Sequence, residues 1–292
     1  MKVAIFGKII TLDSRPFIET LHKELLAENA EIIVFDRLNH FIKDHCDLKL
    51  SFQEFTNHKE LLDFNPDFLI TVGGDGTILD AVTIIRDSGI PILGINTGRL
   101  GFLSNVSKEK ISDAVKALSN GNFTIDERIV LETDTQIPDS HLNFALNEIT
   151  VSRKNTTAMI TIHTWINDEY LNSYWADGLI ISTPTGSTGY SLSCGGPIIM
   201  PGSENFVITP IAPHNLNVRP FVIPNNYSIR LKVEGREEQF LLSLDSRIYT
   251  LNSGFDIKLH LGSFKIKMIK TEVQNFAETL RNKLLWGLDR RN

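Results

Sequence analysis

Residues 67–77 read Asp67-Phe68-Leu69-Ile70-Thr71-Val72-Gly73-Gly74-Asp75-Gly76-Thr77. The apolar run at residues 68–72 predicts a buried strand, and the apolar spacing from Ile78 onwards predicts a helix after the glycines. Glycines let main-chain N–H groups approach an anion closely, and a helix N-terminus adds a favourable dipole. A strand, a glycine turn and a helix in this order therefore predict a phosphate-binding loop.

The Asp75 carboxylate is unexpected in such a loop because it repels a phosphate. It fits the loop if it holds a cation or takes a proton from an attacking hydroxyl. A phosphoryl transferase with Asp75 at its centre is therefore the first hypothesis. The alternative is a tight turn between strand and helix in which Asp75 or Thr77 serves as a cap.

Strand and helix patterns alternate on both sides of this loop. Apolar strands separated by helices predict an α/β domain with a parallel sheet covered on both faces. The predicted strands are residues 3–6, 31–35, 68–72 and 91–95, and the predicted helices are residues 17–29, 57–64, 78–86 and 108–118.

The pattern changes after about Asn122, where short strand-like runs are separated by turn residues and few helical patterns occur. This predicts an all-β region with a sandwich-like or layered arrangement. Helical spacing returns at residues 276–288, and this last helix is expected to pack on the first domain. The predicted domains are residues 1–122, 123–271 and 272–292.

The composition is that of an ordinary globular enzyme. Among 292 residues, 42% are hydrophobic and 22% charged, and the formal net charge is −6. An acidic chain argues against broad binding to nucleic acid or an anionic membrane, since both need a basic face. Cys46 and Cys194 are far apart and form no Cys-x-x-Cys motif, so reduced thiols are expected. The first residues read as a strand and not as a signal peptide, and no apolar run is long enough for a bilayer, so a cytoplasmic protein is expected.

A second glycine-rich turn at residues 94–101 follows the next strand and should open on the same edge of the sheet. Arg99 in this turn either reaches a phosphate or is a solvated loop residue. Two common nucleotide motifs are absent: the chain has no Gly-x-x-x-x-Gly-Lys-Ser/Thr sequence, and the first turn lacks Gly-x-Gly-x-x-Gly. Asp36 ends the second strand, where a Rossmann protein carries a ribose-binding carboxylate, but here it is expected to cap a helix.

The β region contains a run rich in serine, threonine and glycine at residues 177–197, with Tyr190 as its aromatic residue. Small hydroxyl side chains offer donors and acceptors with little bulk, and a tyrosine ring offers a stacking face, which suits a polar ligand with planar rings. An ordinary surface loop has a similar composition. Upstream, Asn147-Glu148 either contacts a base edge and ribose hydroxyls or is a solvated start of a strand.

In combination these segments resemble the NAD kinase family. The resemblance rests on residues 73–77, 96–103, 147–148, 177–197 and 211–220, which occur in order over nearly the whole chain. The Gly-Gly-Asp-Gly-Thr element alone is also shared with diacylglycerol, sphingosine and 6-phosphofructokinases. Its combination with Asn147-Glu148 and the Thr-Pro-Thr-Gly-Ser-Thr-Gly-Tyr-Ser run is specific to NAD kinases.

The resemblance implies transfer of the γ-phosphate of ATP to the 2′-hydroxyl of the adenosine ribose of NAD. It makes Asp75 the proton acceptor and implies a divalent cation, Mg²⁺ first, with metal ligands that the sequence does not identify. It also implies a homo-oligomer, a dimer or tetramer, with neither nucleic acid nor membrane as partner. The implied substrate-contacting residues are Asp75, Gly76, Asn147, Glu148, Asp177, Thr188, Gly189, Tyr190, Ser191, Leu192, Ser193 and Ala212.

Three positions depart from the common family pattern: Trp175, Asp80 and the Ser243–Arg247 segment. Trp175 and Asp80 stand where many relatives carry a polar or basic side chain, and Asp80 is therefore not assigned to the site. His214 in the Pro-His loop is expected to fix that loop rather than act as a base. Two other hypotheses compete with an NAD kinase. The hydroxyl-rich run argues against a lipid kinase, and the intact Asp75 loop argues against a non-catalytic NAD-sensing module.

Overall fold

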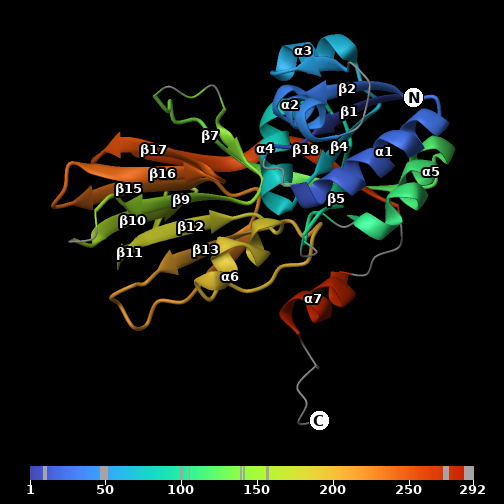
Figure 1. Ribbon diagram of the computed structural model, residues 1–292. Coiled ribbons are helices and arrows are strands. Elements are labelled where there is room, and N and C mark those ends of the chain that lie inside the picture. Colours follow the sequence, from blue (N-terminus) through green and yellow to red (C-terminus); the bar gives the residue numbers. More distant parts are fainter. Residues whose placement is uncertain are drawn as a thin grey trace. The chain divides into compact units, whose positions relative to one another are not determined.

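The computed structural model describes residues 1–8, 12–46, 52–98, 101–104, 106–138, 140, 142–155, 158–271 and 276–285. The chain divides into two compact units. The first unit contains Met1–Glu127 and Ile266–Asn292, and the second contains Arg128–Lys265. Figure 1 shows helices gathered in the first unit and mostly strands in the second.

The first unit contains a parallel sheet with the strand order β5-β4-β1-β2-β3, and β1, β2, β4 and β5 form where the apolar runs predict strands. The order reverses between β1 and β4, and open α/β sheets bind ligands beyond the carboxyl ends of the strands at such a point. Gly73 follows the end of β4 and therefore lies at this edge. The strands are β1 (Lys2–Phe6), β2 (Glu31–Phe35), β3 (Gln53–Phe55), β4 (Phe68–Val72), β5 (Ile92–Asn96) and the short β6 (Val106–Ser107), which pairs with β5.

Helices cover both faces of this sheet, as the sequence predicts. Helices α1 (Arg15–Ala27), α2 (Asp36–His45) and α5 (Ile111–Asn120) share one apolar core with the sheet, and α1 and α5 lie side by side (Figure 1). Helices α3 (His58–Phe64) and α4 (Asp75–Ile85) contact each other outside that core. The last helix, α7 (Phe276–Leu284), belongs to the same unit, where the Phe276 ring lies 6.4 Å from the Phe102 ring. Two 3₁₀ turns, η1 (Leu12–Ser14) and η2 (Lys108–Lys110), complete the unit.

Three local predictions were wrong or incomplete. Helix α2 and strand β3 were not predicted because each is short and buries few residues, such as Leu38 and Ile42 in α2. Helix α4 begins at Asp75, within the glycine motif, and not at residue 78. Asp36 is the first residue of α2, and Phe35 occupies the cap position without a side-chain cap bond. The Asp36 carboxylate therefore does not serve as the predicted cap.

The second unit consists of two antiparallel sheets with an apolar core between them, which fits the predicted sandwich-like domain. One sheet contains β10 (Ile160–Ile166), β11 (Glu169–Ala176), β15 (Ile229–Gly235), β8 (Phe144–Ala145) and parts of the long strands β7 (Thr124–Thr133) and β18 (Asp256–Lys270). The other has the order β14-β13-β12-β9-β16-β17. Its strands are β14 (Phe221–Pro224), β13 (Asn205–Ile211), β12 (Gly178–Ser182), β9 (Glu148–Arg153), β16 (Gln239–Leu244) and β17 (Arg247–Asn252).

The register of β12 places the predicted site segments. Ser182 at the end of β12 pairs with Glu148 at the start of β9, and Gly178 at its beginning pairs with Ile211 at the end of β13. Beyond β12 the chain forms the turn η3 (Gly186–Thr188) and the short helix α6 (Tyr190–Ser193). Segments far apart in the sequence therefore meet at the two ends of one strand.

Both cysteines carry free thiols, and Cys46 is buried. No helix within the described ranges is both long enough and apolar enough to cross a bilayer.

Candidate active site

The Asp75 carboxylate lies at the first residue of α4, directly after the glycine turn. Its Oδ1 accepts hydrogen bonds from the Leu103 N–H at 3.1 Å and from the Ser104 N–H and hydroxyl at 2.9 and 3.0 Å. Its Oδ2 accepts one from the Phe102 N–H at 2.8 Å. Since each carboxylate oxygen offers about two lone-pair positions, Oδ2 keeps capacity for a further donor. The side chain that the sequence marks as catalytic thus also anchors the loop at residues 102–104.

The contact between the Asp75 carboxylate and the loop at residues 102–104 requires a glycine at position 101. A Cβ atom at Gly101 would lie 1.8 Å from Oδ1 of Asp75 and 2.6 Å from the Ser104 hydroxyl oxygen, closer than any real Cβ contact. At Gly98, by contrast, the nearest atom to an added Cβ would be Oδ1 of Asn96 at 3.9 Å. Of these two glycines, only Gly101 is fixed by close packing.

The second glycine-rich turn lies against the first, as expected from neighbouring parallel strands. Asn96 ends β5, and its Nδ2 donates to the Ser104 hydroxyl at 2.8 Å while its Oδ1 accepts from the Gly98 N–H at 2.7 Å. Asp80, one turn into α4, forms an ion pair with Lys8 at 3.1 Å. Arg99, for which a phosphate contact was considered, lies outside the described residues.

In the second unit, the Asn147-Glu148 pair is held by its main chain. The N–H groups of Leu146, Asn147 and Glu148 all donate to the Asp245 carboxylate, at 2.9, 2.8 and 3.2 Å. On the other side, the Asn147 carbonyl accepts a hydrogen bond from the Thr183 N–H at 2.9 Å. These hydrogen bonds therefore fix the main chain of Asn147 and Glu148, the two residues that the sequence predicts to contact NAD.

One side-chain oxygen of each residue lacks a donor in the part of the chain that the structure describes. Among the described residues, Oδ1 of Asn147 and Oε2 of Glu148 are buried without a hydrogen-bond partner, which is costly for polar atoms. Burial, together with the negative charge of Asp245, raises the pKa of Glu148 to about 8. Burial therefore favours the protonated form of the Glu148 carboxyl.

Tyr190 lies near these groups with its side chain partly exposed. Burial of its hydroxyl raises the pKa of the phenol, and Cys194, Asp177 and Glu148 raise it further. A Cβ atom at Gly189 would lie 3.5 Å from Oε2 of Glu148. The structure therefore brings the start of the Thr188–Ser193 segment to the Asn147-Glu148 pair.

Several hydroxyl groups of the serine- and threonine-rich run are used to build the loop itself. Thr183 donates to the Leu146 carbonyl at 2.6 Å, Ser187 donates to the Pro184 carbonyl at 2.7 Å, and the Ser191 hydroxyl bonds that of Thr209 at 2.8 Å. Thr183 and Ser187 therefore use their hydroxyl protons within the loop, and the interpretation that this run presents hydroxyls to a ligand stays a prediction. For Ser191 a binding role stays a prediction.

Asp177 and Ala212 lie at the other end of β12. Asp177 precedes Gly178 in the sequence, and Ala212 follows Ile211, the residue that pairs with Gly178. The Asp177 N–H donates to the Ile211 carbonyl at 3.0 Å, and its carboxylate pairs with Arg153 at 2.9 Å. Ala212 has φ of +43°, an unusual conformation for a residue with a side chain, and such strain concentrates at functional sites. Its neighbour His214 donates its N–H to the Trp175 carbonyl at 2.9 Å, and the two rings lie 4.2 Å apart, which supports the expected loop-fixing role.

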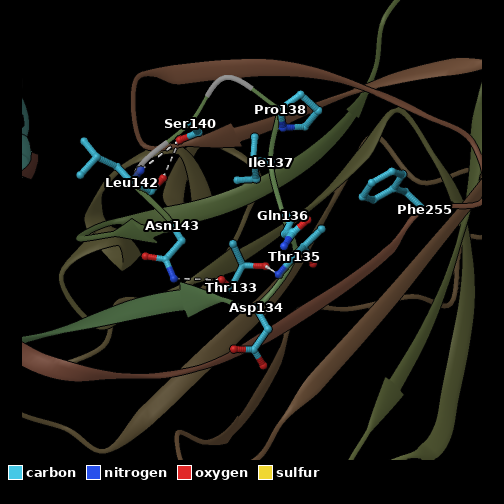
Figure 2. Close-up of a pocket in the computed structure, with 10 residues that line it drawn as sticks. All are labelled: Thr133, Asp134, Thr135, Gln136, Ile137, Pro138, Ser140, Leu142, Asn143 and Phe255. Carbon is cyan, nitrogen blue, oxygen red and sulfur yellow. Dashed lines mark hydrogen bonds between the residues drawn. The ribbon is translucent and has the colours of Figure 1, made fainter.

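The described residues form no cluster of three or more histidine, cysteine, aspartate or glutamate side chains suited to a metal ion. A cavity of about 750 Å³ in the second unit holds none of the predicted site residues (Figure 2). Its polar groups bond one another: Asn143 donates to the Thr133 carbonyl at 3.1 Å, and the Thr135 N–H donates to the Thr133 hydroxyl at 3.1 Å. Neither observation shifts the site away from the two segments described above.

Sequence reasoning missed three residues that shape these segments: Ser104, Asp245 and Arg247. Ser104 bonds Asp75, and Arg247 lies 4.0 Å from Asp245. Asp245 is recognisable only as a polar residue in a turn between two strand patterns, because its partners lie 97–99 residues away.

A sheet of strand order 3-2-1-4-5 with a glycine–aspartate loop, combined with an antiparallel β unit, defines a nucleotide-binding protein of the α/β-plus-β class. Two family models match this chain: the ATP-NAD kinase N-terminal domain at residues 7–123 and the ATP-NAD kinase C-terminal domain at residues 146–271. The chain belongs to the ATP-NAD kinase family, which confirms the resemblance found in the sequence.

Full-length relatives support this assignment. The NAD kinase of Flavobacterium psychrophilum is 51% identical and that of Bacteroides fragilis 43%, and each comparison covers 100% of both chains. Among solved structures, yeast NADH kinase complexed with NADH has a TM-score of 0.87 at 27% identity, covering 99% of this chain and 88% of the other. An NAD kinase from Archaeoglobus fulgidus in complex with ATP has a TM-score of 0.74 at 26% identity, covering 98% of both chains.

Proposed function

We propose that this protein is an NAD kinase, which transfers the γ-phosphoryl group of ATP to the 2′-hydroxyl of the adenosine ribose of NAD and so forms NADP. The observation that carries this proposal is the match of the whole chain to curated NAD kinases at 51% identity and below. Of the two solved relatives, the yeast enzyme is complexed with NADH and the Archaeoglobus fulgidus enzyme with ATP. One is thus bound to a dinucleotide and the other to a phosphoryl donor. The reaction is a phosphoryl transfer, in which positioning and charge stabilisation supply most of the catalysis.

The Asn147-Glu148 pair is the proposed recognition element for NAD. Its two buried oxygens lack hydrogen-bond partners among the described residues, and ribose hydroxyls are groups that supply them. A protonated Glu148 carboxyl can also donate a hydrogen bond to a ligand oxygen. The remaining proposed contacts are Asp177, Thr188, Gly189, Tyr190, Ser191, Leu192, Ser193 and Ala212, of which the exposed Tyr190 ring offers a stacking face.

Asp75 is the proposed general base. A ribose hydroxyl is a weak nucleophile, and a positioned carboxylate that accepts its proton accelerates the attack by about 10²–10⁴-fold. Of the two carboxylate oxygens, Oδ2 is the better candidate, because it accepts one hydrogen bond in the structure while Oδ1 accepts three. The bonds to Oδ1 would hold the carboxylate in place while Oδ2 takes the proton.

The glycine turn before α4 is the proposed site for the phosphates of ATP, with Gly76 beside the reacting groups. Among the described residues, no atom outside the local backbone would lie within 4 Å of a Cβ atom added at Gly74 or Gly76. Main-chain N–H groups at this helix start would donate to phosphate oxygens. The described residues hold no preformed metal cluster. Mg²⁺ would therefore arrive as part of the Mg·ATP substrate, which agrees with its usual reliance on substrate phosphates.

Several predictions from the sequence stay part of this proposal. They are the domain boundaries near residues 122 and 271, a cytoplasmic location, and a dimeric or tetrameric assembly. Their support is the family resemblance and the composition of the chain.

The proposal is tested by incubating the purified protein with Mg·ATP and NAD and detecting NADP with an NADP-specific dehydrogenase. Parallel reactions contain diacylglycerol or sphingosine vesicles in place of NAD. NADP formation without lipid phosphorylation is the expected result. Lipid phosphorylation alone would favour a lipid kinase, and NAD binding without ADP release would favour a sensing module.

A further inference from the structure

Asp245 lies in the hairpin between β16 and β17. It is the first residue of a two-residue turn, and its φ is +52°. Glycine, asparagine and aspartate are the residues that adopt positive φ in such turns most readily. The backbone of this turn therefore accepts an aspartate, and what its carboxylate does there is decided by the contacts of the side chain.

Those contacts are three consecutive main-chain N–H groups. Oδ2 of Asp245 accepts from Leu146 at 2.9 Å, and Oδ1 accepts from Asn147 at 2.8 Å and from Glu148 at 3.2 Å. The Asp245 N–H returns a hydrogen bond to the Glu148 carbonyl at 3.0 Å. The side chain is only 3% exposed, so water cannot readily replace these bonds.

Arg247 balances the buried charge and extends the network. Its Nη2 lies 4.0 Å from Oδ2 of Asp245, and the guanidinium donates to the carbonyl groups of Leu142 and Phe144. Burial raises the pKa of Asp245, but the three amides and Arg247 favour its ionised form. In the neighbouring Glu148 no such contacts oppose burial, and its pKa is raised to about 8.

We infer that Asp245 is a positioning residue for NAD recognition, which fixes the direction of the Asn147 and Glu148 side chains through their main-chain amides. The peptide groups on both sides of the Asn147 Cα are held, one by Asp245 and the other by Thr183. Because the backbone is fixed on both sides, the direction of the Asn147 Cβ is fixed as well. This inference rests on the proposed function, since it assigns NAD contacts to Asn147 and Glu148.

The test uses Asp245→Gly, which removes the carboxylate at a position whose positive φ glycine also adopts freely. Asp245→Asn keeps one oxygen that can accept from Asn147 and Glu148, and loses the acceptor for Leu146. The matched control is Asp168→Gly, because Asp168 also lies in a two-residue hairpin turn with positive φ but has an exposed side chain. For each full-length variant, the Kd of NAD is measured by calorimetry, kcat and the KM of each substrate by NADP formation, and folding by circular dichroism.

The expected result is a rise in the Kd and KM of NAD by about tenfold or more in Asp245→Gly, since each lost buried bond weakens the fixed geometry. Asp245→Asn should give a smaller rise, and the KM of ATP should stay within about twofold in both. Asp168→Gly should match wild type. If both Asp245 variants keep the wild-type affinity for NAD, or weaken NAD and ATP equally, the inference is wrong.

If Asp245→Gly does not fold, Asp245→Asn decides by the same criteria. A wild-type protein that forms no NADP would overturn the proposed function instead, which separates the two failures.

Discussion

The Ser104 N–H and hydroxyl both donate hydrogen bonds to Oδ1 of Asp75, at 2.9 and 3.0 Å. With Leu103 and Phe102, this carboxylate accepts from three consecutive main-chain amides. Asp245 does the same for the amides of residues 146–148. Each unit thus carries one aspartate that accepts hydrogen bonds from three consecutive main-chain amides, and each can be tested by substitution.

Gly101→Ala should damage the Asp75 loop, because its Cβ would lie 1.8 Å from the carboxylate. Overpacking of this kind costs about 1–3 kcal/mol of unfolding free energy, and displacement of Asp75 should lower kcat about tenfold or more. Calorimetric melting and the rate of NADP formation provide the measurements. Gly98→Ala is the matched control and should resemble wild type, since its Cβ meets nothing closer than 3.9 Å. Equal behaviour of the two variants would refute the packing argument.

Gly76→Ala should separate folding from substrate binding. The added Cβ meets no atom of the other described residues within 4 Å, and alanine is favoured over glycine in a helix by about 1 kcal/mol, so the melting temperature should stay or rise. If Gly76 lies beside the substrates, the same methyl group should raise the KM of NAD or ATP. Unchanged kinetics in a stable Gly76→Ala variant would remove Gly76 from the site.

Glu148 should make the protein less stable as the pH rises. Its pKa is raised to about 8 in the folded protein, from 4.5 unfolded. The contribution of the protonated Glu148 carboxyl to the free energy of unfolding is fully present below the unfolded pKa of 4.5. This contribution is lost as the pH rises through the folded pKa of about 8. Asp245 faces this carboxyl, and Tyr190 and Cys194, whose own pKa values are raised, lie close by.

The slope between these values should approach about 1.4 kcal/mol per pH unit for this one group. Urea unfolding of wild type and Glu148→Gln at pH 5, 6.5 and 8 provides the comparison, because glutamine removes the titration and keeps the shape. Parallel curves for the two proteins would show that the pKa of Glu148 is not raised by folding.

The sequence predicts those features that depend on local patterns. The apolar run before Gly73 and the helical spacing after Asp75 predict the strand, the turn and the helix, because periodicity and glycine content act over a few residues. The change to short β strands after Asn122 predicts the antiparallel unit for the same reason. Helix α2 was missed because its ten residues carry few buried apolar positions.

The features that sequence reasoning missed depend on contacts between distant segments. The bonds of Asp75 to residues 102–104 depend on the parallel pairing of β4 with β5. Those of Asp245 require β16 to pair with β9. The hydroxyls of Thr183 and Ser187 look available in the sequence, but folding directs them to carbonyl groups of their own surroundings.

The most direct test compares NADP formation by wild type, Asp75→Asn and Ser104→Ala at saturating Mg·ATP and NAD. Ser104→Ala removes one hydrogen bond to the carboxylate but keeps the proposed base, so it controls for the anchoring role of Asp75. The account predicts that Asp75→Asn lowers kcat by about 10²–10⁴-fold in a folded protein that still binds NAD, while Ser104→Ala loses about tenfold or less. Near-normal turnover by Asp75→Asn would contradict the assignment of Asp75 as the general base.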